Sequence, residues 1–182
     1  MNRAKNNQIK AISPLANKNI FLKIKNFLDK SCEGQSAALV ADILFELLFQ
    51  KTNPRALVSS HPVNQSGKSS HEVLDIDIAI ENKVFCAFEV KDKKVLITDM
   101  KHMFQKAMGK NVLNFGIVLG PQGKLEIPLF DFPAIQLFSL LGIVSVLYDK
   151  EFGQTFIDSL KRRMISKRIS DECRENLHES FE

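Results

Sequence analysis

The feature that most constrains this chain is the strict alternation of apolar and other side chains in LDIDIAIENKVFCAFEVKDKK, residues 74–94. Side chains alternate between the two faces of a strand, so the pattern predicts strands at Val73–Ile80 and Val84–Lys91. Glu81–Lys83 predicts a three-residue turn that would pair the last residue of the first strand with the first residue of the second. The segment is therefore interpreted as a β-hairpin.

The charged side chains of this hairpin are predicted to gather at one end of one face. With a three-residue turn, Asp77 lies opposite Ala87 and Asp75 lies opposite Glu89. The face then carries, in addition to Phe85 and Ala87, the side chains of Asp75, Asp77, Glu89 and Lys91. Other turn registers would shift this pairing.

Adjacent carboxylates are costly to bury unless a positive charge neutralises them. Lys91 supplies one such charge, and a hard cation such as Mg²⁺, which prefers carboxylate oxygens and keeps several waters, would supply the rest. Water bound to Mg²⁺ near a lysine is suited to attack a phosphate. The alternative is a set of cross-strand charge pairs on a solvated sheet face. That alternative does not explain why Phe85 and Ala87 share the face with the carboxylates.

Periodicity along the rest of the chain predicts helices and buried strands in alternation. A polar, Asn- and Lys-rich arm precedes a first helix around residues 20–28. The connection at residues 51–72 is rich in Pro, Ser, Asn and Gly, with a short strand at Ala56–Ser59. The other expected elements are helices at Ser36–Gln50, Thr98–Met108, Pro133–Leu141 and Phe152–Lys167, strands at Leu113–Leu119 and Ile143–Tyr148, and an acidic tail after Ser170 that frays. Strands alternating with helices predict an α/β fold, a mixed sheet covered on both faces.

Composition excludes several classes of protein. Three cysteines form an odd set without metal-ligand spacing, and no pair among the four histidines has the helical spacing of a zinc site. Reduced cysteines and the lack of a secretory signal predict a cytoplasmic protein. The longest apolar run, residues 132–148, is broken by polar residues and glycine, so no membrane association is expected. The net charge is +4, and basic clusters near both ends favour a polyanionic partner such as nucleic acid.

An aspartate near the end of one strand followed by Glu-x-Lys in the next resembles the PD-(D/E)xK nuclease superfamily. Here the elements are Asp77 and Glu89-Val90-Lys91, with Ile76 in place of the proline. The resemblance implies an αβα sandwich with a central mixed sheet of about four to five strands. It also implies Mg²⁺ held by Asp77, Glu89 and the carbonyl of Val90, with Lys91 orienting the attacking water. Asp75 is an alternative first ligand.

By the same resemblance, Glu46 matches the acid that many members place near the metal. The stretch EVKDKKVLITDMKHMFQKA is similar to type II restriction enzymes of the SacI kind. The chain is accordingly interpreted as one nuclease domain over residues 1–182. It would comprise an N-terminal arm and helix to residue 35, a catalytic core over 36–168 and a tail over 169–182.

The function that the resemblance implies is Mg²⁺-dependent hydrolysis of double-stranded DNA by a restriction endonuclease. A junction resolvase or repair nuclease of the same superfamily, and a non-catalytic DNA-binding subunit, are the alternatives. A homodimer and a cognate methyltransferase stay open as further partners. The residues expected to contact DNA are Arg55, Asn64, Gln65 and Lys68 in the connection and Lys93 and Lys94 after the motif.

Overall fold

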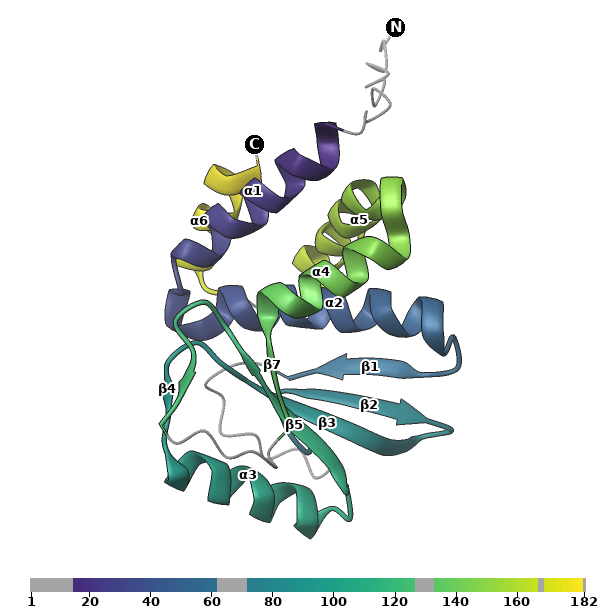
Figure 1. Cartoon of the computed structure of the whole chain (residues 1–182), viewed down its shortest axis with the longest axis vertical. Coiled ribbons are helices and arrows are strands. Elements are labelled where there is room, and N and C mark those ends of the chain that lie inside the picture. Colours follow the sequence, from purple (N-terminus) through teal and green to yellow (C-terminus); the bar gives the residue numbers. More distant parts are fainter. Residues whose placement is uncertain (1–14, 62–71, 127–132, 167–168, 182) are drawn as a thin grey trace, which may run out of the picture.

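The computed structural model describes residues 15–61, 72–126, 133–166 and 169–181 (Figure 1). Its α-helices are α1 (Leu15–Asp29), α2 (Gln35–Thr52), α3 (Ile97–Gly109), α4 (Leu137–Tyr148), α5 (Phe152–Ser166) and α6 (Asp171–Phe181). Short 3-10 helices, η1 (Cys32–Gly34) and η2 (Asp149–Glu151), precede α2 and α5. The strands are β1 (Leu57–Ser60), β2 (Ile76–Ile80), β3 (Lys83–Lys91), β4 (Lys94–Val95), β5 (Asn114–Leu119), β6 (Lys124–Leu125) and β7 (Ala134–Gln136).

The main sheet is mixed and has five strands in the order β1-β2-β3-β5-β7. Strand β2 pairs antiparallel with both β1 and β3, whereas β5 pairs in parallel with β3 and β7 in parallel with β5. The return from β3 to β5 runs through β4 and α3, which is the crossover that parallel neighbours require. Strands β4 and β6 form a separate two-stranded sheet.

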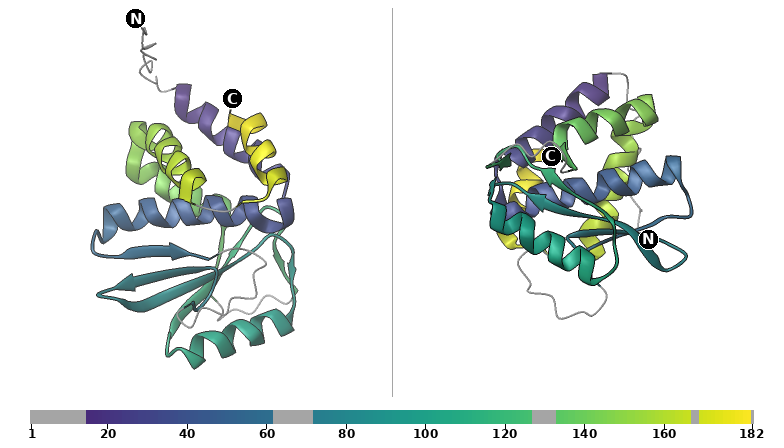
Figure 2. Two further views of the ribbon diagram at one scale, coloured as in Figure 1. Left: turned by 180° about the vertical axis from the view of Figure 1, so that it is seen from behind. Right: turned by 60° about the horizontal axis from the view of Figure 1, so that its bottom comes forward.

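Helices cover both faces of the main sheet (Figures 1 and 2). Helix α2 lies along one face, where Phe45 stacks on Phe88 of β3 with ring centroids 4.5 Å apart. Helix α3 lies along the other face, where Phe104 contacts Phe115 of β5. Helices α1, α4, α5 and α6 lie beyond α2, away from the sheet. The αβα arrangement predicted from the sequence is confirmed.

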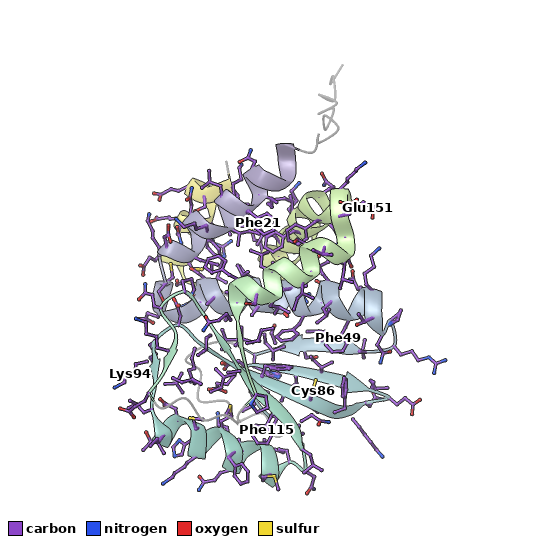
Figure 3. All side chains as sticks on the ribbon, viewed as in Figure 1. Phe21, Phe49, Cys86, Lys94, Phe115 and Glu151 are labelled. Atoms are coloured by element: carbon purple, nitrogen blue, oxygen red, sulfur yellow. The ribbon has the colours of Figure 1, made fainter. Side chains whose placement is uncertain are left out.

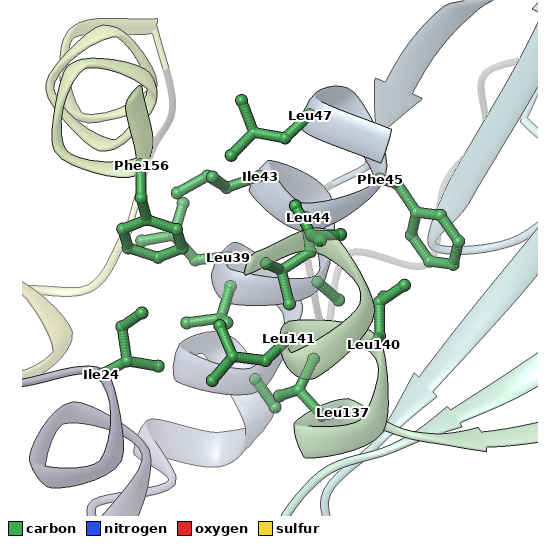
Figure 4. Packing of buried hydrophobic residues seen from close by; sticks show 14 of the residues in the cluster. Ile24, Leu39, Ile43, Leu44, Phe45, Leu47, Leu137, Leu140, Leu141 and Phe156 are labelled. Carbon is green, nitrogen blue, oxygen red and sulfur yellow. The ribbon is translucent and has the colours of Figure 1, made fainter. Parts of the chain in front are cut away.

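The larger core surrounds α2, which is apolar on most of its circumference because it is covered by the sheet on one side and by helices on the other. Figure 4 shows Leu39, Ile43 and Leu44 of α2 packed among Leu140 and Leu141 of α4, Phe156 of α5 and Ile24 of α1. A second, smaller core lies between the sheet and α3, and its buried members include Ala87, Ile117, Met100, Met103 and Ala107. No helix within the described residues is both long and apolar enough to span a membrane.

The structure corrects the expected order of elements around residue 140. The predicted helix over 133–141 and strand over 143–148 are wrong, because the strand comes first, at Ala134–Gln136, and α4 follows over Leu137–Tyr148. The β-branched residues Ile143, Val144 and Val146 suggested a strand. Val144 is instead buried with Leu137, Leu140, Leu141 and Tyr148 at helical spacing, and α4 packs on α2, so tertiary packing overrides the local propensity.

The acidic tail is also ordered, contrary to the expectation that it frays. Residues 171–181 form α6, which packs on α1. The side-chain amide of Asn176 donates a hydrogen bond of 2.8 Å to the carbonyl of Phe27, and Cys173 and Leu177 are buried in the larger core. The acidic residues occupy the outer side of a helix whose inner side is buried.

The hairpin has the predicted pairing from Ile78 back to Ile76, but its turn and the pairs next to the turn differ from the prediction. Ile80 pairs with Lys83, so the turn contains only Glu81 and Asn82, both with positive φ (51° and 64°). Such φ values at both positions are typical of the tight turns that suit the twist of a hairpin. A bulge then shifts the register, and Asp77 again faces Ala87, as predicted.

The bulge also moves one side chain. Phe85, expected beside the carboxylates, packs with the core around α2 and contacts the ring of Phe49. Figure 3 labels Phe49 on α2. Ala87 does stay on the α3 face, in the smaller core.

Candidate active site

The α3 face of the hairpin ends in a group of charged side chains. Glu89 and Lys91 follow Ala87 at every second position of β3, and Asp75 precedes β2. The Nζ atom of Lys91 lies 2.8 Å from Oε1 of Glu89, and the side chains are 21% and 13% exposed. The amide of Val90 donates a hydrogen bond of 2.8 Å to Oδ2 of Asp75. The structure therefore brings together Asp75, Glu89 and Lys91, as the hairpin pattern predicted.

The electrostatics of this group show that its negative charge is incompletely compensated. Burial and the charge of Glu89 raise the pKa of Asp75 to about 6, against the stabilising effects of the Val90 amide and Lys91. Burial alone would lower the pKa of Lys91, but Glu89 and Asp75 together raise it, so Lys91 is a cation at neutral pH. Oε2 of Glu89 is buried and has no hydrogen-bond partner among the described residues.

The raised pKa of Asp75 predicts how the stability of the metal-free protein depends on pH. Between about pH 4 and pH 6 the native state holds a proton that the unfolded state has released, so the free energy of unfolding falls as pH rises. The loss amounts to about 2–3 kcal/mol at pH 7. We expect Asp75→Asn to remove this part of the slope in urea unfolding measured at several pH values. Equal slopes in the two proteins would contradict the prediction.

Asp77 lies beside this group but has different partners. Its side chain is 5% exposed, and its two oxygens accept hydrogen bonds from the amides of Val73 (2.8 Å) and Leu74 (3.0 Å). Nε2 of His61 lies 2.9 Å from its Oδ2. Burial lowers the pKa of His61, but the hydrogen bond and charge of Asp77 outweigh this effect and raise it. Asp77 is thus already supplied with hydrogen-bond donors by its own surroundings.

Glu46 does not join the acidic group. It lies on α2, on the opposite face of the sheet, and points towards α5, where its oxygens are 3.4 Å from Arg162 and Arg163. The expected position of Glu46 beside the metal site is wrong. Glu46 lies on the rim of the apolar face of α2, and that rim faces a second layer of helices rather than the hairpin.

The structure describes three of the residues expected to contact DNA, namely Arg55, Lys93 and Lys94. Arg55 is exposed between α2 and β1, and Asn64, Gln65 and Lys68 lie outside the described residues. Lys93 and Lys94 are exposed directly after the motif, and Figure 3 shows Lys94 on β4. Nζ of Lys94 contacts Oε1 of Glu126 at 2.9 Å, with both side chains on the surface.

Sequence reasoning missed the contribution of α3 and of His61. Lys106, exposed on α3, lowers the pKa of Asp75, and Asp99 contributes to the raised pKa of Lys91. Charged side chains of α3 therefore influence the pKa values of the group. The amphipathic pattern of α3 predicts a charged outer side but not its neighbour. His61 has the local sequence of an inert loop histidine, and nothing there signals a contact with a residue sixteen positions later.

The donor set fits Mg²⁺ better than a metal that needs several protein ligands. No group of three or more His, Cys, Asp or Glu side chains in the described parts of the chain is arranged to hold a metal ion. The predicted ligand set of Asp77, Glu89 and the carbonyl of Val90 contains only two carboxylates and stays a prediction, and Asp75 and Glu89 form the acidic pair at the end of the hairpin. Mg²⁺ is commonly bound by one or two protein carboxylates and completes its coordination shell with water and phosphate. Asp75 and Glu89 match this pattern, and Oε2 of Glu89 is buried without a hydrogen-bond partner among the described residues.

The mixed sheet between helices, with an acidic pair and a lysine at the end of its central hairpin, defines a restriction-endonuclease-like fold. Residues 15–121, more than half of the chain, match the model of the SacI restriction endonuclease C-terminal domain family. The chain belongs to this family. The matched region includes β2, β3, α3 and the whole charged group. A comparison with curated proteins finds no match.

Proposed function

We propose that the chain is a Mg²⁺-dependent endonuclease that hydrolyses phosphodiester bonds in double-stranded DNA as part of a restriction system. The observation that carries the proposal is the buried, unpartnered Oε2 of Glu89 in a group that also contains Asp75 and the protonated Lys91. A buried carboxylate oxygen without a donor is expensive, and a bound cation removes that cost. Membership of a restriction endonuclease family supports DNA as the substrate.

Each residue has a proposed role. Asp75 and Glu89 hold Mg²⁺, with the backbone carbonyl of Val90 between Glu89 and Lys91 as a further oxygen donor. The bound ion would activate water and stabilise the charge that develops on the phosphate. Because its pKa is raised, Lys91 is protonated at neutral pH and cannot act as a base. It instead donates hydrogen bonds to the attacking water or to the phosphate oxygens. Asp75 replaces Asp77 as the preferred first ligand, because both oxygens of Asp77 already accept hydrogen bonds.

The test is cleavage of supercoiled plasmid and of a genomic-length linear DNA by the full chain in Mg²⁺, in Ca²⁺ and in EDTA. Discrete fragments that require Mg²⁺ would support a restriction endonuclease. Cleavage confined to four-way junctions or damaged DNA would favour the repair or resolvase alternative. Binding of DNA without cleavage under any of these conditions would support the non-catalytic subunit and contradict the proposal.

Lys93 and Lys94 are proposed to contact DNA phosphates, because they are exposed immediately after the charged end of β3. We expect Lys93→Ala with Lys94→Ala to weaken DNA binding and to reduce the slope of log affinity against log salt by about 0.9 for each lysine–phosphate pair removed. Lys83→Ala, at the opposite end of β3, is the matched control and should leave both quantities unchanged. Fluorescence anisotropy in Ca²⁺ over a salt series measures them. An unchanged slope in the double variant would contradict the assignment.

A further inference from the structure

The segment that leads to Asp75 has no regular structure of its own. Residues 72–75 precede β2 and belong to neither a helix nor a strand. Their backbone groups therefore lack the ladder of hydrogen bonds that fixes a strand and must find other partners. Such a segment would position a functional carboxylate poorly unless side chains hold it.

Two residues hold this segment from one side. Asp77 accepts hydrogen bonds from the amides of Val73 and Leu74, and its side chain is nearly inaccessible to solvent. The amide of His61 donates a hydrogen bond of 2.9 Å to the carbonyl of Asp75. The imidazole of His61 links Asp77 to Glu72 at the start of the segment. Its Nε2 lies 2.9 Å from Oδ2 of Asp77, and its Nδ1 lies 3.3 Å from Oε1 of Glu72. Every residue from 72 to 75 is thus bound by His61 or Asp77.

We infer that His61 and Asp77 form a positioning brace that orients Asp75 towards Glu89, and that neither residue binds the metal or the substrate. The inference rests on the proposed function, in which Asp75 and Glu89 hold Mg²⁺. Both oxygens of Asp77 are used by the backbone, whereas Asp75 receives the Val90 amide on one oxygen and faces Glu89. A shift of about 1 Å in a positioned group is enough to lower a rate by roughly two orders of magnitude.

The test uses five variants of the full chain, one of which, Asp75→Asn, removes a proposed Mg²⁺ ligand. His61→Ala removes the brace, and His61→Gln retains an N–H donor at a similar reach. Asp77→Asn replaces the carboxylate. Tyr148→Phe is the control for stability, since it removes a buried hydrogen bond to the carbonyl of Leu47 on the far side of α2. The readouts are Mg²⁺ binding by calorimetry without DNA, the thermal midpoint, and kcat and KM for cleavage at saturating Mg²⁺.

For a brace, His61→Ala should weaken Mg²⁺ binding roughly tenfold, within the range known for groups that orient metal ligands. It should also lower kcat with little change in KM for DNA. His61→Gln should restore most of the Mg²⁺ affinity and of kcat. Asp77→Asn should resemble His61→Ala rather than abolish binding. Tyr148→Phe should lower the thermal midpoint without changing Mg²⁺ affinity.

Two results would overturn the inference. Unchanged Mg²⁺ binding and kcat in His61→Ala, with only a lower thermal midpoint, would make His61 purely structural. Complete loss of Mg²⁺ binding in Asp77→Asn, with full binding in Asp75→Asn, would make Asp77 the ligand. Failure of the proposed function has a different signature: wild-type protein that neither binds Mg²⁺ nor cuts DNA. In that case Asp75 has no ion to bind, and the brace has no positioning role.

Discussion

Glu89→Gln is expected to lower the rate of DNA cleavage by roughly 10²–10³-fold or more while leaving the protein folded. This factor is the one typically seen when an enzyme loses a group that stabilises charge in the transition state. The change removes one oxygen ligand and the negative charge that, with Asp75, attracts the cation. It also removes a buried carboxylate with an unpartnered oxygen, so the free energy of unfolding without metal should stay the same or rise. Cleavage kinetics and urea unfolding of the same preparation measure both quantities.

Asp75→Asn is the partner experiment and should reduce cleavage to a similar extent, since the two acids are proposed to share one ion. Glu179→Gln is the matched control, because Glu179 is an acid on the surface of α6 that forms an ion pair with the exposed Lys30. It should retain cleavage within about twofold of wild type, as expected of an exposed pair worth less than about 1 kcal/mol. Full activity in Glu89→Gln would show that the catalytic centre lies elsewhere.

The hairpin was predictable because its two faces differ: one packs apolar side chains against α2, and the other carries the charged group on the α3 side. A slip of one residue would turn every side chain to the wrong face, so burial fixes the register more strongly than the turn does. The predicted three-residue turn is wrong, yet Asp77 still faces Ala87, because a shorter turn and a bulge compensate for each other. The alternating pattern does not reveal the bulge itself, which turns Phe85 towards α2.

The different surroundings of Asp75 and Asp77 could not be predicted from the sequence. Both lie on the same side of one alternating segment, and their difference arises from contacts beyond the hairpin. Asp77 binds the amides of Val73 and Leu74 and the imidazole of His61, and these partners depend on the path of the chain before β2. Local periodicity carries no information about such a path.

Glu46 illustrates the same limit for helices. Periodicity identifies α2 as a buried helix, and it correctly places Glu46 at the edge of the apolar face. It does not reveal that α2 is covered on both sides, so that its edge faces α5 instead of the hairpin. The acid on α2 therefore belongs to an ion-pair cluster that has a structural role.

The centre of that cluster is the pair Asp42–Arg163. Asp42 on α2 is fully buried, and Nε of Arg163 on α5 lies 2.6 Å from its Oδ2. The guanidinium of Arg163 also lies 3.4 Å from Oδ1, so it engages both oxygens of the carboxylate. The pair joins α5 to the side of α2 that faces away from the sheet. It can therefore be altered without touching the charged end of the hairpin.

Arg163→Met should lower the free energy of unfolding by about 3 kcal/mol, because the buried charge of Asp42 loses its guanidinium partner. Arg162→Met is the control: Arg162 is 54% exposed and lies 3.4 Å from Glu46, so its loss should cost less than about 1 kcal/mol.

Asp42→Leu combined with Arg163→Met should recover most of the stability, since an apolar pair of similar volume has no desolvation cost. Urea unfolding of the wild type and these variants gives the differences, and cleavage at a temperature where all are folded should be equal. A loss in Arg163→Met no larger than in Arg162→Met would show that the pair is not the link between α5 and α2.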